Sequence, residues 1–289
     1  MKIIPWIYAA RPKTLVASVI PVVSSVFILP EKHIFNFYIF ILTIIAAVII
    51  QIVTNYINDL YDFLKGADTN RLGPKRMVQS GLIQKHEIEK AIIILIIVGI
   101  ICGIPLAIQG GWIIVAIGLS SFLFAYLYTS GPIPLAYNAM GDIFVFIYFG
   151  IIAVTGSFYL QTGYIDINAL FLGSALGFQN MILLSVNNLR DYHNDKKVNK
   201  RTLVVIIGQK LSKIQTCIII MLFYLAIYWL ALNLNNIQIL YFILLGLPLS
   251  ANIIYDIWYK QKAELNSTLA KSSLFQIANM LLLLLGIYI

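Results

Sequence analysis

The sequence predicts an all-α integral membrane protein with nine transmembrane helices. Of its 289 residues, 60% are hydrophobic and only 11% are charged, and the mean hydropathy is +0.88. A soluble domain carries roughly a quarter charged residues, so this composition excludes an ordinary soluble fold. Nine apolar runs are long enough to cross the ~30 Å hydrocarbon core of a bilayer as helices.

The predicted spans follow one another with connections too short for a soluble domain. We predict them at residues 14–30, 37–58, 88–108, 112–129, 140–160, 168–189, 212–232, 238–257 and 273–289. Pro21, Pro105 and Pro248 lie inside or near the ends of these runs. Membrane helices tolerate such prolines because neighbouring helices satisfy the freed backbone groups. We therefore expect residues 1–289 to form one polytopic membrane domain.

The positions of Lys and Arg predict how the chain is oriented in the membrane. The net charge is +8, and the chain contains 20 Lys and Arg residues. Lys32 alone follows an odd-numbered span, whereas the others lie in the N-terminal segment or around the connections after spans 2, 6 and 8. Because positive residues gather on the cytoplasmic side, we expect a cytoplasmic N-terminus and an external C-terminus in the cell (inner) membrane. This placement argues against nucleic acid as a partner.

The two longest basic connections suggest an internal duplication. Residues 63–87 and 190–211 each follow a helix end rich in Asn and Asp, and four spans separate them. We therefore expect a bundle of two four-helix units plus one final helix. Parallel repeats of this kind usually hold the functional site at the interface between units.

The first acidic segment continues the apolar run at 37–58. On a helix, two amides and two carboxylates fall within about 100° of one another and form a single polar face: Asn55, Asn58, Asp59 and Asp62. A solvated helix end would explain one Asp, but it does not explain four polar residues on one face. Asp68, Lys75 and Arg76 follow in a polar loop. Mg²⁺ takes one or two carboxylates and completes its shell with phosphate oxygens and water, while basic side chains neutralise phosphate.

The second acidic segment follows the run at 168–189. Asn188, Asp191 and Asp195 span about 60° of a helix, again on one face, and Arg190 lies among them. Lys196 to Arg201 form a basic stretch directly after them. Two metal sites that face each other could hold one diphosphate between two ions and stabilise charge on the leaving group.

This combination of groups points to a substrate that is half diphosphate and half hydrocarbon, such as an allylic isoprenyl diphosphate. Departure of the diphosphate leaves an allylic cation, which aromatic faces can stabilise. Tyr128 and Tyr137 lie near the junction of the fourth and fifth spans and are candidates for substrate contacts, although most tyrosines there serve packing.

The paired motifs Asn58-Asp59-x-x-Asp62 and Asn188-x-x-Asp191-x-x-x-Asp195 resemble those of the UbiA-type intramembrane aromatic prenyltransferases. That family is similar in having nine transmembrane helices with both motifs on the cytoplasmic side. Further stretches resemble its branch in menaquinone synthesis: residues 10–15, 58–69, 131–137, 141–146 and 186–191. The resemblance implies transfer of a polyprenyl group from polyprenyl diphosphate to 1,4-dihydroxy-2-naphthoate, with loss of diphosphate and CO₂.

The resemblance also implies roles for individual residues. Mg²⁺ would be held by Asn58, Asp59, Asp62, Asp68, Asn188, Asp191 and Asp195. Asp62, Asp191 and Asp195 would be catalytic. The substrates would be bound by Lys13, Asn55, Lys75, Arg76, Arg190, Tyr128, Tyr137 and Asp142.

Two positions depart from the family pattern. The family usually has a third Asp four residues after Asp62, where this chain has Gly66. Asp68 would supply that carboxylate only if its loop folds back toward the helix. Asp142 replaces a Glu of the branch, which leaves its role open.

Other activities fit the same residues. Within the family, the acceptor could be 4-hydroxybenzoate, homogentisate, haem or an archaeal glycerol phosphate. A secondary transporter is an alternative of a different class, although transporter acids usually lie near the bilayer midplane rather than at its edge. A CDP-alcohol phosphotransferase would need a single run of acids with Gly, Ala and Arg, which this chain lacks.

Overall fold

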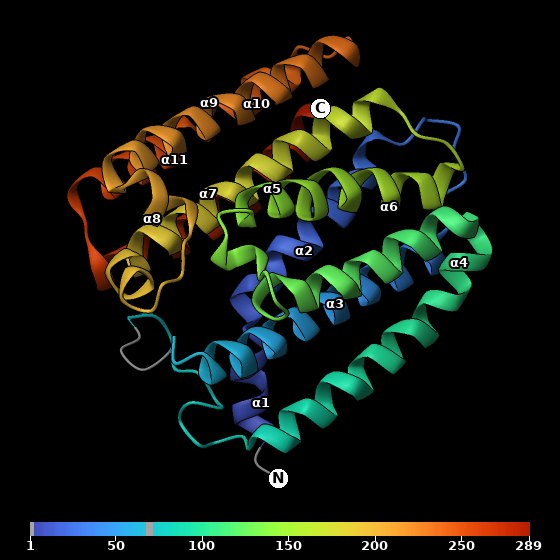
Figure 1. The fold of residues 1–289 in the computed structure, drawn as a ribbon. Coiled ribbons are helices and arrows are strands. Elements are labelled where there is room, and N and C mark those ends of the chain that lie inside the picture. Colours follow the sequence, from blue (N-terminus) through green and yellow to red (C-terminus); the bar gives the residue numbers. More distant parts are fainter. Residues whose placement is uncertain (1–2, 68–71) are drawn as a thin grey trace.

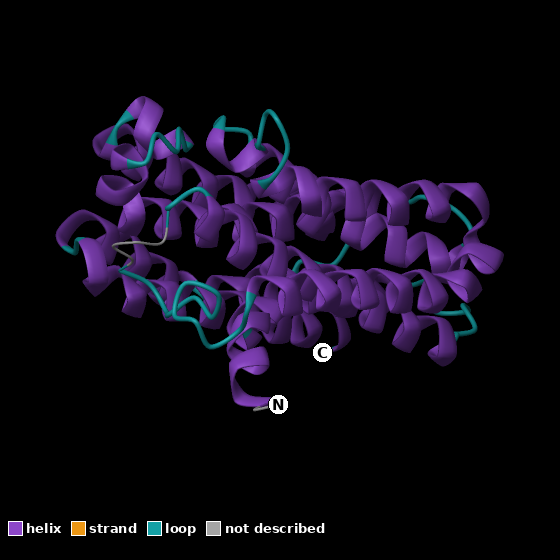
Figure 2. Ribbon diagram, turned by 60° about the horizontal axis from the view of Figure 1, so that its bottom comes forward, coloured by secondary structure: helices purple, strands orange, loops and turns teal. Residues whose placement is uncertain are grey.

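The computed structural model describes residues 3–67 and 72–289, and throughout these ranges the chain is built from helices joined by loops (Figures 1 and 2). The described part contains no strand, and its one isolated bridge joins Asn138 to Arg201. The all-α prediction is therefore confirmed.

The helices of the first half begin with a short N-terminal helix and end with a broken one. They are α1 (Ile3–Ala10), α2 (Pro12–Ser25), η1 (Val26–Ile28), α3 (Phe37–Leu64), α4 (Lys85–Thr129), η2 (Leu135–Tyr137), α5 (Gly141–Phe146), the π-helical turn η3 (Ile147–Ile152) and α6 (Ala153–Thr162). The helices of the second half are α7 (Ile167–Lys197), α8 (Leu203–Ile207), α9 (Gln209–Asn233), α10 (Gln238–Leu244), α11 (Leu247–Tyr259), η4 (Lys262–Glu264) and α12 (Leu265–Tyr288).

Six helices in the described ranges are long and apolar enough to cross a membrane, and the number rises to eight if each of two bent pairs forms one span. The bent pairs are α1 with the helix that follows it, at 50°, and α10 with α11, at 41°. α4 counts once among the six, although Gly111 leaves helical geometry inside it (φ 64°, ψ −157°). Figure 1 shows α4 folding back on itself as two arms.

Polar caps at helix starts explain several boundaries. The Asn36 side chain accepts a hydrogen bond from the Ile39 amide at the start of α3, and Asp166 accepts one from Asn168 at the start of α7. Such caps satisfy amides that have no partner within the helix. Gln84 and Glu87 form a reciprocal capping box at the start of α4.

α3 and α7 extend beyond the apolar runs that predicted them. α3 continues to Leu64 and α7 to Lys197, so both acidic segments lie on uninterrupted helices. These helix ends persist because their polar side chains pair with neighbouring loops rather than with water. The Asn194 side chain, for example, donates a hydrogen bond of 2.8 Å to the Ala67 carbonyl at the end of α3.

The last predicted span, at residues 273–289, lies on a helix that begins earlier, because α12 starts at Leu265. The extra turns are stabilised by Asp256 of α11, a buried carboxylate. It forms ion pairs with Lys260 at 3.0 Å and Lys271 at 2.8 Å and accepts a hydrogen bond from Thr268 at 3.0 Å. Polar residues that look like a loop in the sequence therefore lie on a packed helix.

Glycines allow the fifth predicted span to pack directly on α7. A Cβ at Gly150 would collide with the α carbon of Gly177 and would lie 2.5 Å from the Gly173 carbonyl oxygen. Only residues without side chains permit this approach, as is common between membrane helices. The contact fixes α5, η3 and α6 against the helix that carries the second acidic segment.

Candidate active site

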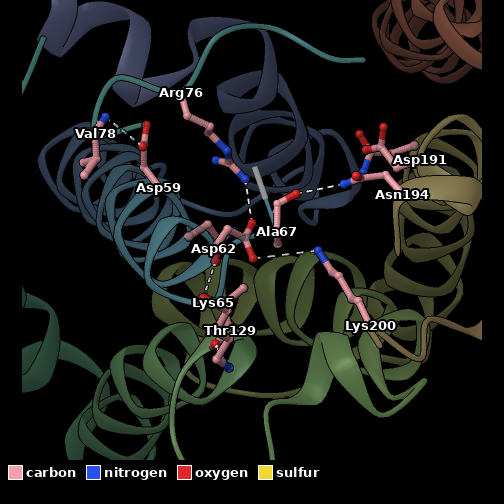
Figure 3. Close-up of polar contacts among 12 residues, drawn as sticks. Asp59, Asp62, Lys65, Ala67, Arg76, Val78, Thr129, Asp191, Asn194 and Lys200 are labelled. Carbon is pink, nitrogen blue, oxygen red and sulfur yellow. Dashed lines mark hydrogen bonds and ion pairs between the residues drawn. The ribbon is translucent and has the colours of Figure 1, made fainter. Parts of the chain in front are cut away.

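The two acidic segments meet at one end of the bundle. The C-terminal ends of α3 and α7 lie toward the same end of the bundle in Figure 1, and the hydrogen bond from Asn194 to Ala67 connects α7 to the residues just after α3. Figure 3 shows Asp62 on one side of this junction and Asp191 on the facing helix. The sequence-based prediction that distant segments share one site is consistent with this arrangement.

Asp62 is surrounded by cationic and hydroxyl donors. Its side chain is buried, and its Oδ2 atom lies 2.7 Å from Nη2 of Arg76, which is also buried. The Tyr137 hydroxyl donates to Oδ1 at 2.9 Å, and Lys200 Nζ lies 3.9 Å from the same oxygen. Figure 3 shows Arg76 and Lys200 approaching Asp62 from different sides. The carboxylate therefore lies in a strongly positive environment.

Two lysines meet at the ring of Tyr137. Lys65 Nζ lies 4.4 Å and Lys200 Nζ 5.1 Å from the ring centroid, distances at which the cations are attracted to the ring face. Lys65 also donates a hydrogen bond of 2.6 Å to the Thr129 carbonyl. Desolvation lowers the pKa of Lys65, Asp62 acts in the opposite direction, and Lys200 lowers it further. An anion bound here would relieve the repulsion between the two amines.

Asp59 points away from this centre toward the loop that follows α3. Its two oxygens accept hydrogen bonds from the backbone amides of Met77 and Val78 at 3.1 and 3.2 Å. This geometry suits an anchor for the loop that carries Arg76 better than a metal ligand. Asn58, one residue earlier, accepts a hydrogen bond of 2.8 Å from the Thr129 hydroxyl.

Arg190 is almost fully buried, at 2% exposed, and has a partner for each of its nitrogens. Nε and Nη2 bind both oxygens of Asp191 at 2.8 and 2.6 Å, while Nη1 binds Asn266 at 3.0 Å and Nη2 binds Asn187 at 2.8 Å. A side chain at Gly73 would lie 2.9 Å from this guanidinium. Arg190 thus joins α7, α12 and the loop after α3, and its saturated bonds leave it little capacity for phosphate.

The other predicted ligands of α7 are buried near this centre. Asp195 is 4% exposed, and its backbone carbonyl accepts a hydrogen bond of 2.8 Å from the Lys200 amide. Asn188 is also buried, and its side chain forms no hydrogen bond within the described ranges. The Asn188 carboxamide is therefore available to a ligand.

The remaining predicted residues of the first half of the chain do not contact Asp62 directly in the described structure. Lys13 and Lys75 are exposed, and neither forms an ion pair with another described residue. Asn55 donates to the Ala10 carbonyl at 2.8 Å and to Thr14 at 3.0 Å, so it ties α3 to the junction of α1 and α2. Asp68 lies outside the described residues.

The Tyr128 hydroxyl, from the end of α4, lies close to the start of α5, which carries Asp142. Asp142 is buried, and a Cβ on the adjacent Gly141 would lie 3.1 Å from the Tyr128 hydroxyl. That hydroxyl lies in the electrostatic field of Asp142, Asp62 and Asp195. Both residues are therefore part of the same polar region.

The donor set fits a metal ion that arrives with a phosphate. Among the described residues, no three His, Cys, Asp or Glu side chains form a group that could hold an ion by themselves. Mg²⁺ needs only one or two protein carboxylates when phosphate oxygens and waters complete its octahedron. Asp62 and Asp195, with the amides of Asn58 and Asn188, meet that smaller requirement.

An apolar cavity of about 410 Å³ lies below the polar region. It is bounded by α2, α3, both arms of α4 and the α5–η3–α6 segment, and Tyr128 belongs to its wall. Phe124, Phe144 and Tyr148 form an aromatic cluster in the same wall, with ring centroids 4.7 to 6.2 Å apart. The volume lies within the range of small-molecule sites.

The polar, cationic region around Asp62 and the apolar cavity next to it agree with the protein family whose sequence profile this chain matches. The profile described as "UbiA prenyltransferase family" covers residues 18–280. The chain belongs to the UbiA prenyltransferase family. Together with its apolar helices, this makes it a multi-pass membrane protein.

Relatives within the UbiA family extend along nearly the whole chain. The 1,4-dihydroxy-2-naphthoate octaprenyltransferase of Haemophilus influenzae is 30% identical over 98% of this chain and 96% of its own. A UbiA homologue from Aeropyrum pernix has the same fold, with a TM-score of 0.75 at 12% identity over 94% and 97% of the two chains. A UbiA homologue from Archaeoglobus fulgidus, solved with DMAPP and Mg²⁺ bound, gives a TM-score of 0.65 at 15% identity over 96% and 98%.

The sequence-based prediction did not single out Lys65, Thr129 or Lys200. Lys200 belongs to a run of basic residues in which spacing gives no reason to prefer one. Lys65 lies three residues after Asp62, which is a helical neighbour position, and this spacing was the available signal. Thr129 is buried, and its hydroxyl and carbonyl contact Asn58 and Lys65. In this UbiA protein, Lys65, Thr129 and Lys200 belong to the site because of contacts with residues far away in the sequence.

Proposed function

We propose that this protein transfers a polyprenyl group from polyprenyl diphosphate to 1,4-dihydroxy-2-naphthoate. Diphosphate and CO₂ leave, and the product after oxidation is demethylmenaquinone. The relative from Haemophilus influenzae, aligned over nearly its full length, supports the acceptor. The observation that carries the reaction class is Asp62, a buried carboxylate ringed by Arg76, Lys200 and Tyr137 above an apolar cavity.

The head of the donor substrate binds between the ends of α3 and α7. Asp62, Asp195, Asn58 and Asn188 supply oxygen ligands for Mg²⁺, and Asp191 joins them if Arg190 shares its carboxylate. Mg²⁺ neutralises charge on the departing diphosphate when it is bound. Asp59 holds the loop that carries Arg76, and Asp68, which follows α3 in the sequence, is a further candidate ligand.

The cations of this region bind the phosphate oxygens. Arg76 and Lys200 lie at Asp62, and Lys65 lies 4.4 Å from the centroid of the Tyr137 ring. Lys13 and Lys75, which are exposed, contribute at the rim. Positive charge fixed before the substrate arrives stabilises the leaving group without reorganisation during the reaction.

The hydrocarbon part of the donor occupies the cavity below. Its wall contains aromatic faces that stabilise an allylic cation and exclude water from it. The electron-rich ring of the acceptor then attacks C1 of the isoprenyl group through the carbon that bears the carboxylate. The long tail leaves the site sideways into lipid.

We infer a topology of nine spans within one membrane domain of residues 1–289. The eight spans that follow from the bent pairs become nine if the two arms of α4, separated at Gly111, each cross the membrane. The distribution of Lys and Arg then places the N-terminus and the active site in the cytoplasm and the C-terminus outside.

An acceptor panel tests this function. Purified protein in detergent is supplied with farnesyl diphosphate, Mg²⁺ and one of 1,4-dihydroxy-2-naphthoate, 4-hydroxybenzoate or homogentisate, and products are identified by mass spectrometry. We expect a prenylated, decarboxylated product from the naphthoate only. Product from hydroxybenzoate but not from the naphthoate would overturn the acceptor, and absence of any prenylated product would overturn the reaction class.

A further inference from the structure

Gln51 of α3 lines the apolar cavity and takes no part in the diphosphate site described above. Its side chain is buried, with 7% of its surface exposed. It lies one helical turn before Asn55 and seven residues before Asn58, on the same helix face, so it lies deeper in the membrane than the polar region. A carboxamide at this depth needs partners for both its donor and its acceptor atoms.

A chain of hydrogen bonds fixes which way this carboxamide is turned. The Thr14 hydroxyl donates to the Arg11 carbonyl at 2.9 Å, so its oxygen is left as an acceptor. Asn55 Nδ2 donates to that oxygen at 3.0 Å and to the Ala10 carbonyl at 2.8 Å, which turns Asn55 Oδ1 toward Gln51. Because Oδ1 can only accept, Gln51 must present Nε2 to it, at 3.4 Å.

The network therefore ends at Gln51 Oε1, a buried oxygen with no donor in the described part of the chain. Leaving such an acceptor unpaired is costly, and a residue that lines a cavity can receive its donor from whatever occupies the cavity. The isoprenyl tail is pure hydrocarbon and carries no donor. The aromatic acceptor carries two ring hydroxyls, and the cluster of Phe124, Phe144 and Tyr148 offers its ring an aromatic wall in the same cavity.

We propose that Gln51 Oε1 accepts a hydrogen bond from the 4-hydroxyl of the dihydroxynaphthoate and so determines specificity for that acceptor. The 1-hydroxyl lies beside the carboxylate and can bond to it internally, whereas the 4-hydroxyl has no internal partner. A site that holds a hydroxyl discriminates against analogues that lack it, because the buried oxygen is then left unpaired. This inference rests on the proposed acceptor.

The test compares Gln51→Leu with wild type, using 1-hydroxy-2-naphthoate as the probe that lacks the 4-hydroxyl. For wild type, we expect this analogue to bind about tenfold more weakly than 1,4-dihydroxy-2-naphthoate, measured as Ki against KM. In the variant, the KM for the dihydroxynaphthoate rises about tenfold, the preference over the analogue disappears, and the KM for farnesyl diphosphate stays unchanged.

Thr54→Val is the matched control. Thr54 lines the same cavity, but its hydroxyl already donates to the Ile50 carbonyl at 2.8 Å, so we expect the tenfold preference to persist. If Gln51 only supports the junction of α1 and α2, the Leu variant unfolds at lower temperature while it keeps the preference of the wild type, and the proposal is refuted. If wild type prenylates no naphthoate at all, it is the proposed function that has failed.

Discussion

Arg190 and Arg76 show how similar residues beside acidic motifs acquire different roles. Both are buried and both pair with an Asp of the predicted metal site. Arg76 reaches Asp62 from a loop, whereas Arg190 binds its own neighbour Asp191 and also Asn187 and Asn266. The sequence identified both as cations near diphosphate. It could not separate them, because one partner of Arg190, Asn266, lies 76 residues away on α12.

This difference predicts that Arg190→Ala destabilises the protein. Removing the buried guanidinium leaves the carboxylate of Asp191, which is 15% exposed, without its ion pair and the Asn187 carboxamide without its donor, which costs about 3 kcal/mol. We expect a markedly lower unfolding temperature in detergent, followed by intrinsic fluorescence. Lys197→Ala is the control, because it removes the same charge from an exposed position of α7. Equal unfolding temperatures for the two variants would contradict the structural role of Arg190.

At the scale of the elements, helices and their polar faces followed from apolar runs and helical periodicity. The packing of α5, η3 and α6 on α7 could not be predicted in this way. It depends on Gly150, Gly173 and Gly177, and the sequence does not indicate which helix these glycines face. The early start of α12 was missed for a related reason. Its first turns are polar, and the contacts of Thr268 and Lys271 with the buried carboxylate of Asp256 depend on how α11 and α12 pack.

The glycine contact predicts different outcomes for two Gly→Ala substitutions. At Gly150, an added methyl would collide with the backbone of α7, so we expect Gly150→Ala to destabilise by roughly 1–3 kcal/mol or more. At Gly103 nothing lies within 4 Å of an added Cβ, so Gly103→Ala should be neutral or stabilising by up to about 1 kcal/mol. Thermal unfolding in detergent measures both. A Gly150→Ala variant as stable as Gly103→Ala would disprove the close approach.

For the whole molecule, the membrane class and the meeting of the two acidic segments could be predicted, since hydropathy and repeated helix-end motifs carry that information. The hydrogen-bond network around Asp62 could not be predicted, because Arg76, Tyr137 and Lys200 come from three different connections between long helices, and the paths of these connections depend on the complete fold. The topology remains a prediction from charge placement.

Cysteine accessibility tests that topology. In a variant with Cys102 and Cys217 replaced, we expect Lys32→Cys to react with a membrane-impermeant maleimide in intact cells. Lys75→Cys should react only after the membrane is permeabilised, because the connection after α3 is predicted to be cytoplasmic. The reverse labelling pattern would show that the protein has the opposite orientation in the membrane, with the active site outside.

The most direct test of the central claim is a thermal shift with pyrophosphate and Mg²⁺. If Asp62 and the facing end of α7 hold a diphosphate through Mg²⁺, saturating pyrophosphate should raise the unfolding temperature of wild type by about 5 °C. The shift should disappear with EDTA and in Asp62→Asn, which keeps an oxygen for Arg76 but lacks the charge. An equal shift in Asp62→Asn, or one independent of Mg²⁺, would contradict the account.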